Sequence, residues 1–370
     1  MQILDSQLSS QLDLQQRLVN IPERLLATLQ DITLKLEIES QYCIKHPDYK
    51  PLELAPETVA RFEQLPSDLQ NKFLKLQLSN FLYGIYYNGA YQQSLAPDGD
   101  GVNLEVNPLE NNTFLGVDVT FYERLHQSNQ GDGYYSGGWQ VVKESDGSLA
   151  VNKGGLTLHI EREIHLQSQH QAATIGDLVA IKLPKNLVQN GFYMAVGNAS
   201  QSHENITRVY FNLTCDGAVA VMESLTAQLN AINLPFAFKA LYNPSDYTRY
   251  DSAVLYFNKN NYEAVHAVLA QVYAQHQAHF KSQVPLFTKF IAPGLAIAEE
   301  PDQKFGDKES FGMNRCQILA NGLLEAWHQG NNSPESRMQS ILEQFSATGV
   351  ELQRPYLNAD SEDIYLDIAY

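Results

Sequence analysis

The sequence predicts an α+β protein: a helical N-terminal region followed by a mixed β-sheet with helices mainly on one face. Two patterns predict this class. From about residue 10 to residue 92, apolar residues recur at the three- and four-residue spacing of amphipathic helices. From residue 208 onward, strand-like and helical runs follow in the order β-α-β-β-α, which favours helices packed on one face of a sheet.

The length and composition are those of a globular protein. The chain has 370 residues, 44% of them hydrophobic, which is enough for one large domain or two ordinary ones. A polar, turn-rich segment at 93–113 follows the helical region. We therefore expect a helical N-terminal region at 1–92 and an α+β domain at 93–370.

The charge balance excludes two classes of partner. Lys and Arg total 25 against 42 Asp and Glu, a net charge of −17, which repels nucleic-acid phosphates and anionic lipid surfaces. The first residues lack a signal-peptide pattern, and no uncharged apolar window is long enough to span a membrane. Three widely separated cysteines with no CxxC spacing fit a reducing compartment. We expect a cytoplasmic protein that binds neither nucleic acid nor membrane.

The segment after the polar boundary predicts β-structure. Gly pairs separate short β-like runs between 131 and 162, as in a meander of hairpins. The Gly-aromatic stretch GDGYYSGGWQ at 131–140 is either a hairpin turn or a substrate flap. Residues 175–184 and 190–198 are both strand-like.

The rest of the chain alternates strands and helices. Asp216 is a candidate N-cap for the first helix, and the acidic tail at 358–370 is expected to be peripheral. Strands are expected at 208–214, 235–242 and 251–257, and helices at 215–232, 261–280, 310–330 and 333–349.

Lys239 stands out because it lies at the centre of the apolar run PFAFKALY. An ammonium group among aromatic residues is poorly hydrated, which favours the neutral amine. The side chain either reaches an edge of the sheet or faces a site. If the aromatic face of this strand is covered by helices, Lys239 projects from the other face.

Strand alternation places a second cation on the same face. In the strand at 208–214, Arg208 and Tyr210 share one face, and Val209 and Phe211 share the opposite, core-facing one. Arg208 is therefore expected on the same open side of the sheet as Lys239.

Five cations lie inside or beside apolar segments in a chain that is poor in basic residues. Arg offers a planar fork of donors and Lys a compact charge, so together they suit a phosphate or carboxylate. Structural salt bridges and side chains that reach the surface are the alternative for each one. The five are Lys239, Arg208, Arg249, Lys289 and Arg315.

Metal and nucleotide chemistry are not indicated. There is no HExxH motif, no paired His/Cys spacing and no GxxxxGK[ST] loop, so we expect neither a metal nor another cofactor. His159, on the strand-like run LTLHI, is either an acid or an ordinary hydrated strand residue.

Three blocks of sequence resemble the HopA type III effector family, in its cyanobacterial and actinobacterial branch. They begin with RVYFNLT at 208, VPLFTKFIAPGLAIAEEP at 284 and SFGMNRCQILANGLLEAW at 310, and the resemblance extends over about 110–355. Members of this branch act in the maturation of thioamitides and class V lanthipeptides. The resemblance therefore implies a lyase that removes phosphate from Ser or Thr of a precursor peptide after a separate kinase-like protein has added it.

The resemblance suggests roles for the singled-out residues. Phosphate β-elimination needs a base for the Cα proton and cations for the departing phosphate, and an acid can assist. Lys239 suits the base. Lys289 either helps to bind the phosphate or exchanges roles with Lys239. Tyr210 or His159 would be the acid. The phosphate ligands would be Arg208, Arg249 and Arg315. A phosphopeptide-binding module without chemistry, and an interaction scaffold with structural cations, are the alternatives.

Overall fold

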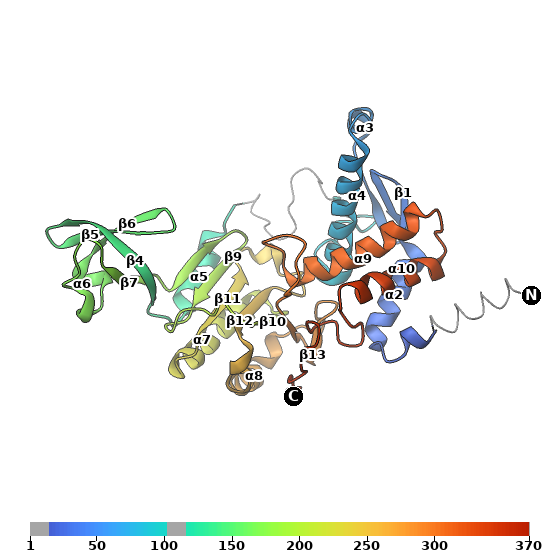
Figure 1. Cartoon of the computed structure of the whole chain (residues 1–370). Helices are drawn as coiled ribbons and strands as arrows, with labels where there is room; N and C mark the ends of the chain where they lie inside the picture. Colours follow the sequence, from blue (N-terminus) through green and yellow to red (C-terminus); the bar gives the residue numbers. More distant parts are fainter. Residues whose placement is uncertain (1–14, 102–115, 370) are drawn as a thin grey trace, which may run out of the picture.

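The computed structural model describes residues 15–101 and 116–369 and confirms the α+β class. Three regions follow one another across the molecule (Figure 1): a four-stranded sheet, a seven-stranded central sheet and a helical region built from both ends of the described chain. No helix within these residues is long and apolar enough to cross a membrane.

The helical region combines N-terminal and C-terminal segments. Helices α4 and α9, α9 and α10, and α10 and α2 contact one another. Gly322 allows the close approach of α9 to α10, because a Cβ atom at this position would lie 2.6 Å from the Ile341 Cα. The helices are α2 (Glu23–Lys35), α3 (Pro56–Phe62), α4 (Ser67–Phe81), α9 (Phe311–His328) and α10 (Pro334–Ala347), and α4 continues into a π-helical turn, η1 (Leu82–Tyr87).

The N-terminal region also contains a small sheet that the helical pattern did not predict. Ile38 lies opposite Ile44, and Ile44 lies opposite Leu52, so one row of apolar residues is buried against the helices. After Lys35 the alternation of buried and exposed residues is that of strands, although the apolar spacing in this segment also fits a helix. The strands are β1 (Glu37–Ser40), β2 (Cys43–His46) and β3 (Tyr49–Glu53).

The central sheet has the strand order β13-β14-β10-β12-β11-β9-β8. We expected a mixed sheet, but every neighbouring pair is antiparallel. Strands β10 and β11 run parallel, and β12 lies antiparallel between them, so no parallel ladder forms. The strands are β8 (Asn186–Gln189), β9 (Phe192–Val196), β10 (Ile206–Phe211), β11 (Phe236–Leu241), β12 (Ala253–Asn258), β13 (Lys289–Ala292) and β14 (Leu295–Glu299).

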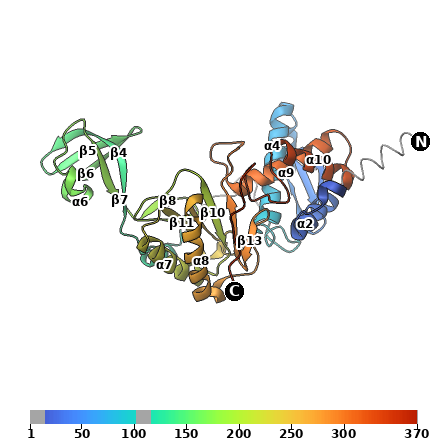
Figure 2. The same cartoon turned by 60° about the horizontal axis from the view of Figure 1, so that its bottom comes forward.

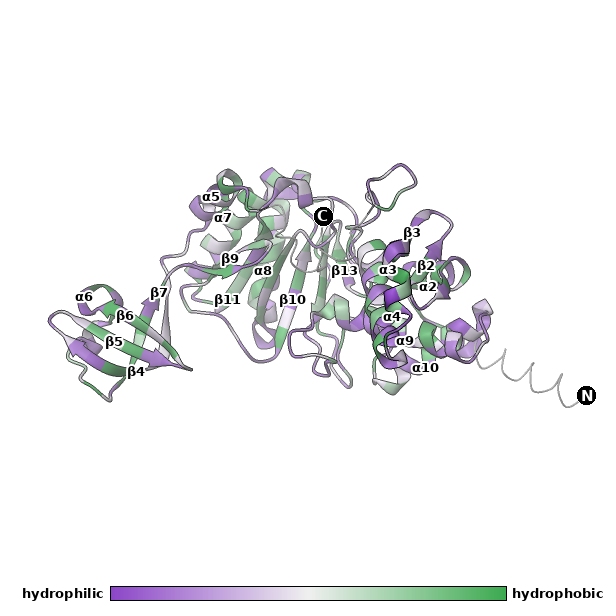
Figure 3. Cartoon of the chain, turned by 90° about the horizontal axis from the view of Figure 1, so that it is seen from above, coloured by the Kyte–Doolittle hydropathy of each residue, from purple (hydrophilic) through white to green (hydrophobic). Residues whose placement is uncertain are grey.

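Three helices cover one face of the central sheet: α5 (Val119–Ser128), α7 (Cys215–Ala231) and α8 (Tyr262–His276). Figure 2 shows α7 and α8 side by side on this face. Phe211 and Phe238 are fully buried here, with ring centres 5.3 Å apart, and the strands carry mostly hydrophobic residues (Figure 3). Burial of these rings is the main stabilising term for this face.

The N-cap of α7 differs from the expected one. Thr214 occupies the N-cap position, where its Oγ1 accepts a hydrogen bond from Gly217 N at 3.1 Å. Asp216 lies in the first turn, where a carboxylate also favours the positive end of the helix.

The four-stranded sheet has its own small core, which includes Trp139, Val151 and Ile181. The stretch GDGYYSGGWQ is not a hairpin turn, because its residues from Tyr134 onward belong to the long strand β4. The strand order is β6-β5-β4-β7, and the elements are β4 (Tyr134–Ser145), β5 (Ser148–Lys153), β6 (Leu156–Glu161), β7 (Leu178–Leu183) and the short helix α6 (Arg162–His165).

The C-terminal tail is integral to the fold rather than peripheral. Tyr365 is buried, and its hydroxyl lies 3.0 Å from Thr207 Oγ1. The Ile368 N donates to the Ile291 carbonyl oxygen of β13 at 2.9 Å. The tail therefore adds along one edge of the central sheet.

Candidate functional site

A cavity of about 250 Å³ lies on the open face of the central sheet, opposite α7 and α8. The helical region closes one side of this cavity through η1 and the start of α9. The lining residues are Tyr83, Tyr87, Gln189, Phe192, Arg208, Tyr210, Lys239, Arg249, Asp251, Val254, Tyr256, Lys308 and Ser310. We call this cavity the cationic pocket.

Strand register explains why residues from separate strands meet here. Tyr210 lies opposite Val254, and Val254 lies opposite Lys239, so the three form one cross-strand row. Arg208 lies opposite Tyr256 in the next cross-strand row on the same face, two residues along β10 from Tyr210. Directly opposed residues share a face, so Lys239, Tyr210 and Arg208 all project into the pocket.

The Lys239 ammonium rests on aromatic rings. Its Nζ lies 4.2 Å from the centre of the Phe192 ring and 5.6 Å from that of Tyr256. Among the described residues no carboxylate forms an ion pair with it. The side chain is half-buried, so this charge is available to a ligand.

Arg249 is held from behind by a buried carboxylate. Its Nε and Nη2 donate to the two oxygens of Asp251 at 2.8 and 2.9 Å. Burial opposes ionisation of Asp251, but Arg249 and nearby Lys239 hold the pKa of this carboxyl below its usual value. This geometry occupies one edge of the guanidinium and leaves Nη1 without a partner among the described residues.

Arg208 is arranged in the same way. Its Nε and Nη2 donate to Glu300, and the guanidinium carbon lies 5.1 Å from the centre of the Tyr256 ring. Its Nη1, too, has no partner within the described part of the chain. The pocket therefore receives one unused edge from each of two fixed arginines.

Tyr210 presents a buried hydroxyl that makes no hydrogen bond of regular geometry within the described residues, although the Tyr87 hydroxyl interacts with it. Burial raises the pKa of this hydroxyl well above its usual value, although Arg208 and the Tyr87 hydroxyl oppose the rise. An unpaired buried hydroxyl destabilises a fold unless a ligand satisfies it, so it is a candidate contact to substrate.

The helical region contributes the remaining wall. Tyr83 and Tyr87 of η1 are stacked, with ring centres 4.8 Å apart. Gly312 permits this packing, because a Cβ there would lie 2.4 Å from the Tyr87 ring. Ser310 caps α9 by accepting a hydrogen bond from Met313 N, so the positive end of this long helix lies at the pocket.

The net charge of the site is opposite in sign to that of the chain. Four lining residues are cations, Arg208, Lys239, Arg249 and Lys308, and Asp251 is the single carboxylate among them. The lining residues alone therefore have a balance of three positive charges. Glu300, outside the lining, pairs both with Arg208 and with Lys304, so these two outer residues leave the balance unchanged. A pocket of this kind in a chain with a net charge of −17 suits a dianion such as a phosphate group.

Three residues singled out in the sequence lie elsewhere. Arg315 is buried in the helical region, where its Nε and Nη2 donate to the Pro355 and Leu357 carbonyl oxygens at 2.8 and 3.0 Å. These bonds anchor the segment after α10 and leave the residue outside the pocket lining. Burial lowers the pKa of Arg315 to about 10.

Lys289 and His159 are also remote from the pocket. Lys289, on β13, pairs with Asp363 at 3.0 Å and donates to the Tyr365 carbonyl oxygen, so it holds the C-terminal tail. His159 is exposed on β6 of the four-stranded sheet, where its backbone pairs with Ala150. We do not include these residues or Arg315 in the proposed site.

Several pocket residues were not singled out in the sequence. Asp251 lies only two positions after Arg249, and this spacing of opposite charges was the available signal. Phe192 and Tyr256 look like ordinary strand aromatics, and Lys308 lies in a polar loop. Within the described residues no cluster of three His, Cys, Asp or Glu side chains could hold a metal ion.

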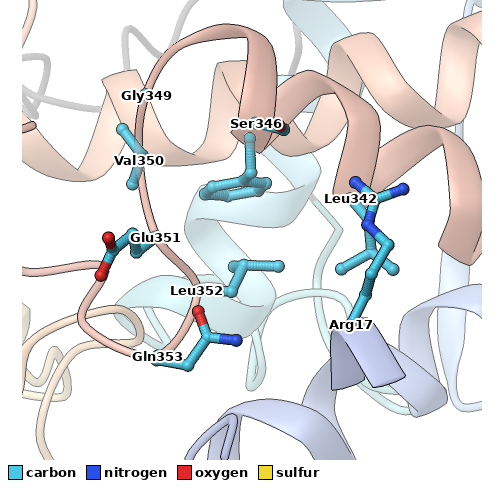
Figure 4. Close-up of a pocket in the computed structure, with 9 residues that line it drawn as sticks. Arg17, Leu342, Ser346, Gly349, Val350, Glu351, Leu352 and Gln353 are labelled. Carbon is cyan, nitrogen blue, oxygen red and sulfur yellow. The ribbon is translucent and has the colours of Figure 1, made fainter. Parts of the chain in front are cut away.

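A second pocket lies in the helical region and differs in chemistry (Figure 4). Its volume is about 380 Å³, and its charged side chains are Arg17 and Glu351, on opposite sides. None of the buried unpaired polar atoms belongs to it. It therefore lacks the charge and the unmet hydrogen-bonding capacity of the cationic pocket.

Comparison with known proteins finds a similarity to a family over part of the chain. The model of the HopA1 effector protein family matches residues 183–357, which is 175 of the 370 residues. A search of curated proteins finds no match.

Two solved structures match most of the chain at low sequence identity. The effector protein from Pseudomonas syringae pv. tomato strain DC3000 has 16% identity, covers 82% of this chain and 95% of its own, and gives a TM-score of 0.41. The effector protein from Pseudomonas syringae pv. syringae strain 61 has 16% identity, covers 83% and 99%, and gives 0.43. On the match of the family model alone, the chain has at residues 183–357 a region similar to the HopA1 effector protein family.

Proposed function

We propose that the cationic pocket binds a phosphorylated Ser or Thr of a precursor peptide and eliminates the phosphate, which leaves a dehydroamino acid. In this proposal the chain is the lyase subunit of a cytoplasmic peptide-maturation system, related to the cyanobacterial and actinobacterial branch of the HopA family. A separate kinase-like protein supplies the phosphorylated substrate, and the lyase itself uses no metal or other cofactor.

The reaction assigns a distinct task to each side chain. Once the Lys239 ammonium has lost its proton, its amine removes the Cα proton, the electron pair of the C–H bond forms the Cα=Cβ bond, and the Cβ–O bond breaks. The phosphate leaves with the electron pair of the Cβ–O bond, stabilised by the unused edges of Arg208 and Arg249. Tyr210 can donate its hydroxyl hydrogen to the departing oxygen.

The observation that carries the proposal is the difference between Lys239 and the two arginines. Each arginine is fixed by a carboxylate, whereas the Lys239 ammonium has aromatic neighbours and, in the described chain, forms no ion pair with a carboxylate. Fixed cations suit phosphate binding, and an amine without a counterion suits proton transfer. The alternative, a phosphopeptide-binding module without chemistry, needs the arginines but gives Lys239 no special role.

The test is mass spectrometry of a synthetic phosphoserine peptide after incubation with the full chain. Loss of one phosphoric acid, with capture of the product by an added thiol, supports elimination. Hydrolysis back to serine, or retention of the phosphate under all conditions, would contradict it. Binding without any loss of phosphate would favour the non-catalytic alternative.

A further inference from the structure

The two edges of the central sheet differ in how they are covered. At the β13 edge, the tail lies along the strand, with Ile368 N bonded to Ile291 O. At the β8 edge, the strand pairs only with β9 among the described residues. One edge is therefore occupied by the chain itself, and the other is open.

The hydrogen-bond pattern shows which backbone groups point outward from β8. Val196 N donates to the Lys185 carbonyl oxygen at 2.9 Å, in register with the β8–β9 pairing. Backbone groups alternate along an antiparallel strand, so Leu187 and Gln189 also face β9. Asn186 and Val188 consequently present their N–H and C=O groups to the open side.

This edge lacks the features that usually keep edges from pairing. Natural edge strands carry charged residues, prolines or bulges. β8 reads NLVQ, with no charge and no proline, and its pairing with β9 is regular. Val188 is 97% exposed. These four residues are thus available to pair with another extended chain.

The open edge is continuous with the cationic pocket. Gln189, the last residue of β8, lines the pocket. Leu187 lies opposite Met194, and Met194 lies opposite Lys239, so a single row of side chains leads from the edge to the amine.

We propose that β8 is the docking edge for an extended segment of the phosphorylated peptide, which adds to the central sheet as an eighth strand. This inference rests on the proposed function, because it concerns how the same substrate is held. Pairing supplies affinity from backbone hydrogen bonds, largely independent of the peptide sequence.

The strand order also sets the number of residues between the peptide segment that pairs with β8 and the phosphorylated residue. A strand added beside β8 would lie three strand spacings from β11, roughly 14 Å from Lys239. An extended chain covers about 3.3 Å per residue, so the paired segment is about four residues from the phosphorylated one. Substrates shorter than this cannot use the edge.

The test compares two phosphoserine peptides, one of about 15 residues and one of about three. Only the longer one can reach from the pocket to the β8 edge. Val188→Pro removes an outward N–H and places a ring on the edge without breaking a β8–β9 bond, since proline is tolerated at edges. Val188→Thr is the matched control, because it keeps both the N–H and β-branching. We expect Val188→Pro to weaken binding of the long peptide about tenfold or more, and to leave the short peptide and the control unchanged.

Amide hydrogen exchange gives a readout that needs no variant. In the wild-type chain the amides of Asn186 and Val188 should become protected when the long peptide is added, and should not when the short one is added. Equal binding of the long peptide by wild type and Val188→Pro, equal weakening of both peptides, or no change in exchange at β8 would each overturn the proposal. The two proposals can fail separately. If the wild type releases no phosphate but binds the long peptide more tightly than Val188→Pro does, the docking edge stands and the lyase function fails.

Discussion

The Nζ atom of Lys239 lies 4.2 Å from the centre of the Phe192 ring, and the Arg249 guanidinium carbon lies 5.8 Å from the same ring. One aromatic side chain thus positions both an amine that forms no ion pair with any described residue and an arginine fixed by Asp251. The ring excludes water from beneath both groups, so each charge acts in a less polar setting than bulk solvent. This arrangement separates the roles of proton transfer and phosphate binding, and mutations can test that separation.

Lys239→Arg should keep the positive charge and remove the base. We expect elimination from a phosphoserine peptide to fall by at least about 100-fold, because general-base catalysis contributes this much or more. Binding of the same peptide should change little, since a base acts mainly in the transition state. Lys143→Arg, at an exposed position of β4, is the control. Equal rates for Lys239→Arg and wild type would remove Lys239 from the mechanism.

Arg208→Lys should weaken phosphate binding. The substitution keeps the charge but loses the planar fork that bonds Glu300 with one edge and faces the pocket with the other. We expect affinity for a phosphoserine peptide to fall about tenfold, measured by fluorescence anisotropy, while affinity for the serine peptide is unchanged. Arg61→Lys, on the exposed surface of α3, should bind like the wild type. An equal loss for both peptides would show that Arg208 supports the fold rather than the phosphate.

Asp251→Asn should destabilise the protein and alter its response to acid. Removing one partner of a buried ion pair leaves Arg249 uncompensated, which costs about 3–5 kcal/mol of the free energy of unfolding. The pKa of Asp251 is lower in the folded chain than in the unfolded one. Its contribution to the free energy of unfolding is therefore fully present at pH values above the pKa in the unfolded chain, and is lost as the pH falls below about 4.

Thermal unfolding at several pH values measures both effects. We expect the wild type to lose stability more steeply than Asp251→Asn as the pH falls below about 4. Parallel pH profiles for the two proteins would mean that Asp251 is not ionised in the fold.

Much of this site is predictable from local pattern. Strand alternation places Arg208 and Tyr210 on one face, and the lysine of PFAFKALY on the face opposite its aromatic residues. These relationships depend only on the period of a strand, which neighbouring residues determine.

The remainder depends on contacts between distant segments. Arg249 and Arg315 look alike in sequence, since each lies beside apolar residues, but one faces Phe192 and the other bonds carbonyl groups about 40 positions further along. Tyr83 and Tyr87 reach the pocket from more than 100 positions earlier in the chain. Insertion of β12 between β10 and β11 places Arg208, Tyr210 and Lys239 on one face of the sheet beside one another, and no local periodicity encodes that strand order.

Arg315→Met tests the structural role of this buried arginine. It would leave the Pro355 and Leu357 carbonyl oxygens without their donors, and each such loss costs about 1–3 kcal/mol. We expect a clear fall in Tm and an unchanged rate of phosphate release per folded molecule. A reduced rate at an unchanged Tm would instead place Arg315 in the chemistry.

Tyr210→Phe should raise stability and lower activity. The Tyr210 hydroxyl is buried and makes no hydrogen bond of regular geometry within the described residues, so its removal relieves a desolvation cost of about 1 kcal/mol or more. The same hydroxyl is the proposed acid, so the elimination rate should fall at least about tenfold. A residue kept at a cost to stability is expected where function needs an unsatisfied group.

The matched control is Tyr262→Phe, which should have the opposite effect on stability. The Tyr262 hydroxyl donates to the Leu366 carbonyl oxygen at 3.2 Å and accepts from Leu366 N at 2.7 Å, so its loss breaks two hydrogen bonds to the tail. We expect Tm to fall for Tyr262→Phe and to rise for Tyr210→Phe, with activity lost only in the latter. If Tyr210→Phe instead destabilises the chain, its hydroxyl already has a partner in the folded protein, and the case for a substrate contact at this position is lost.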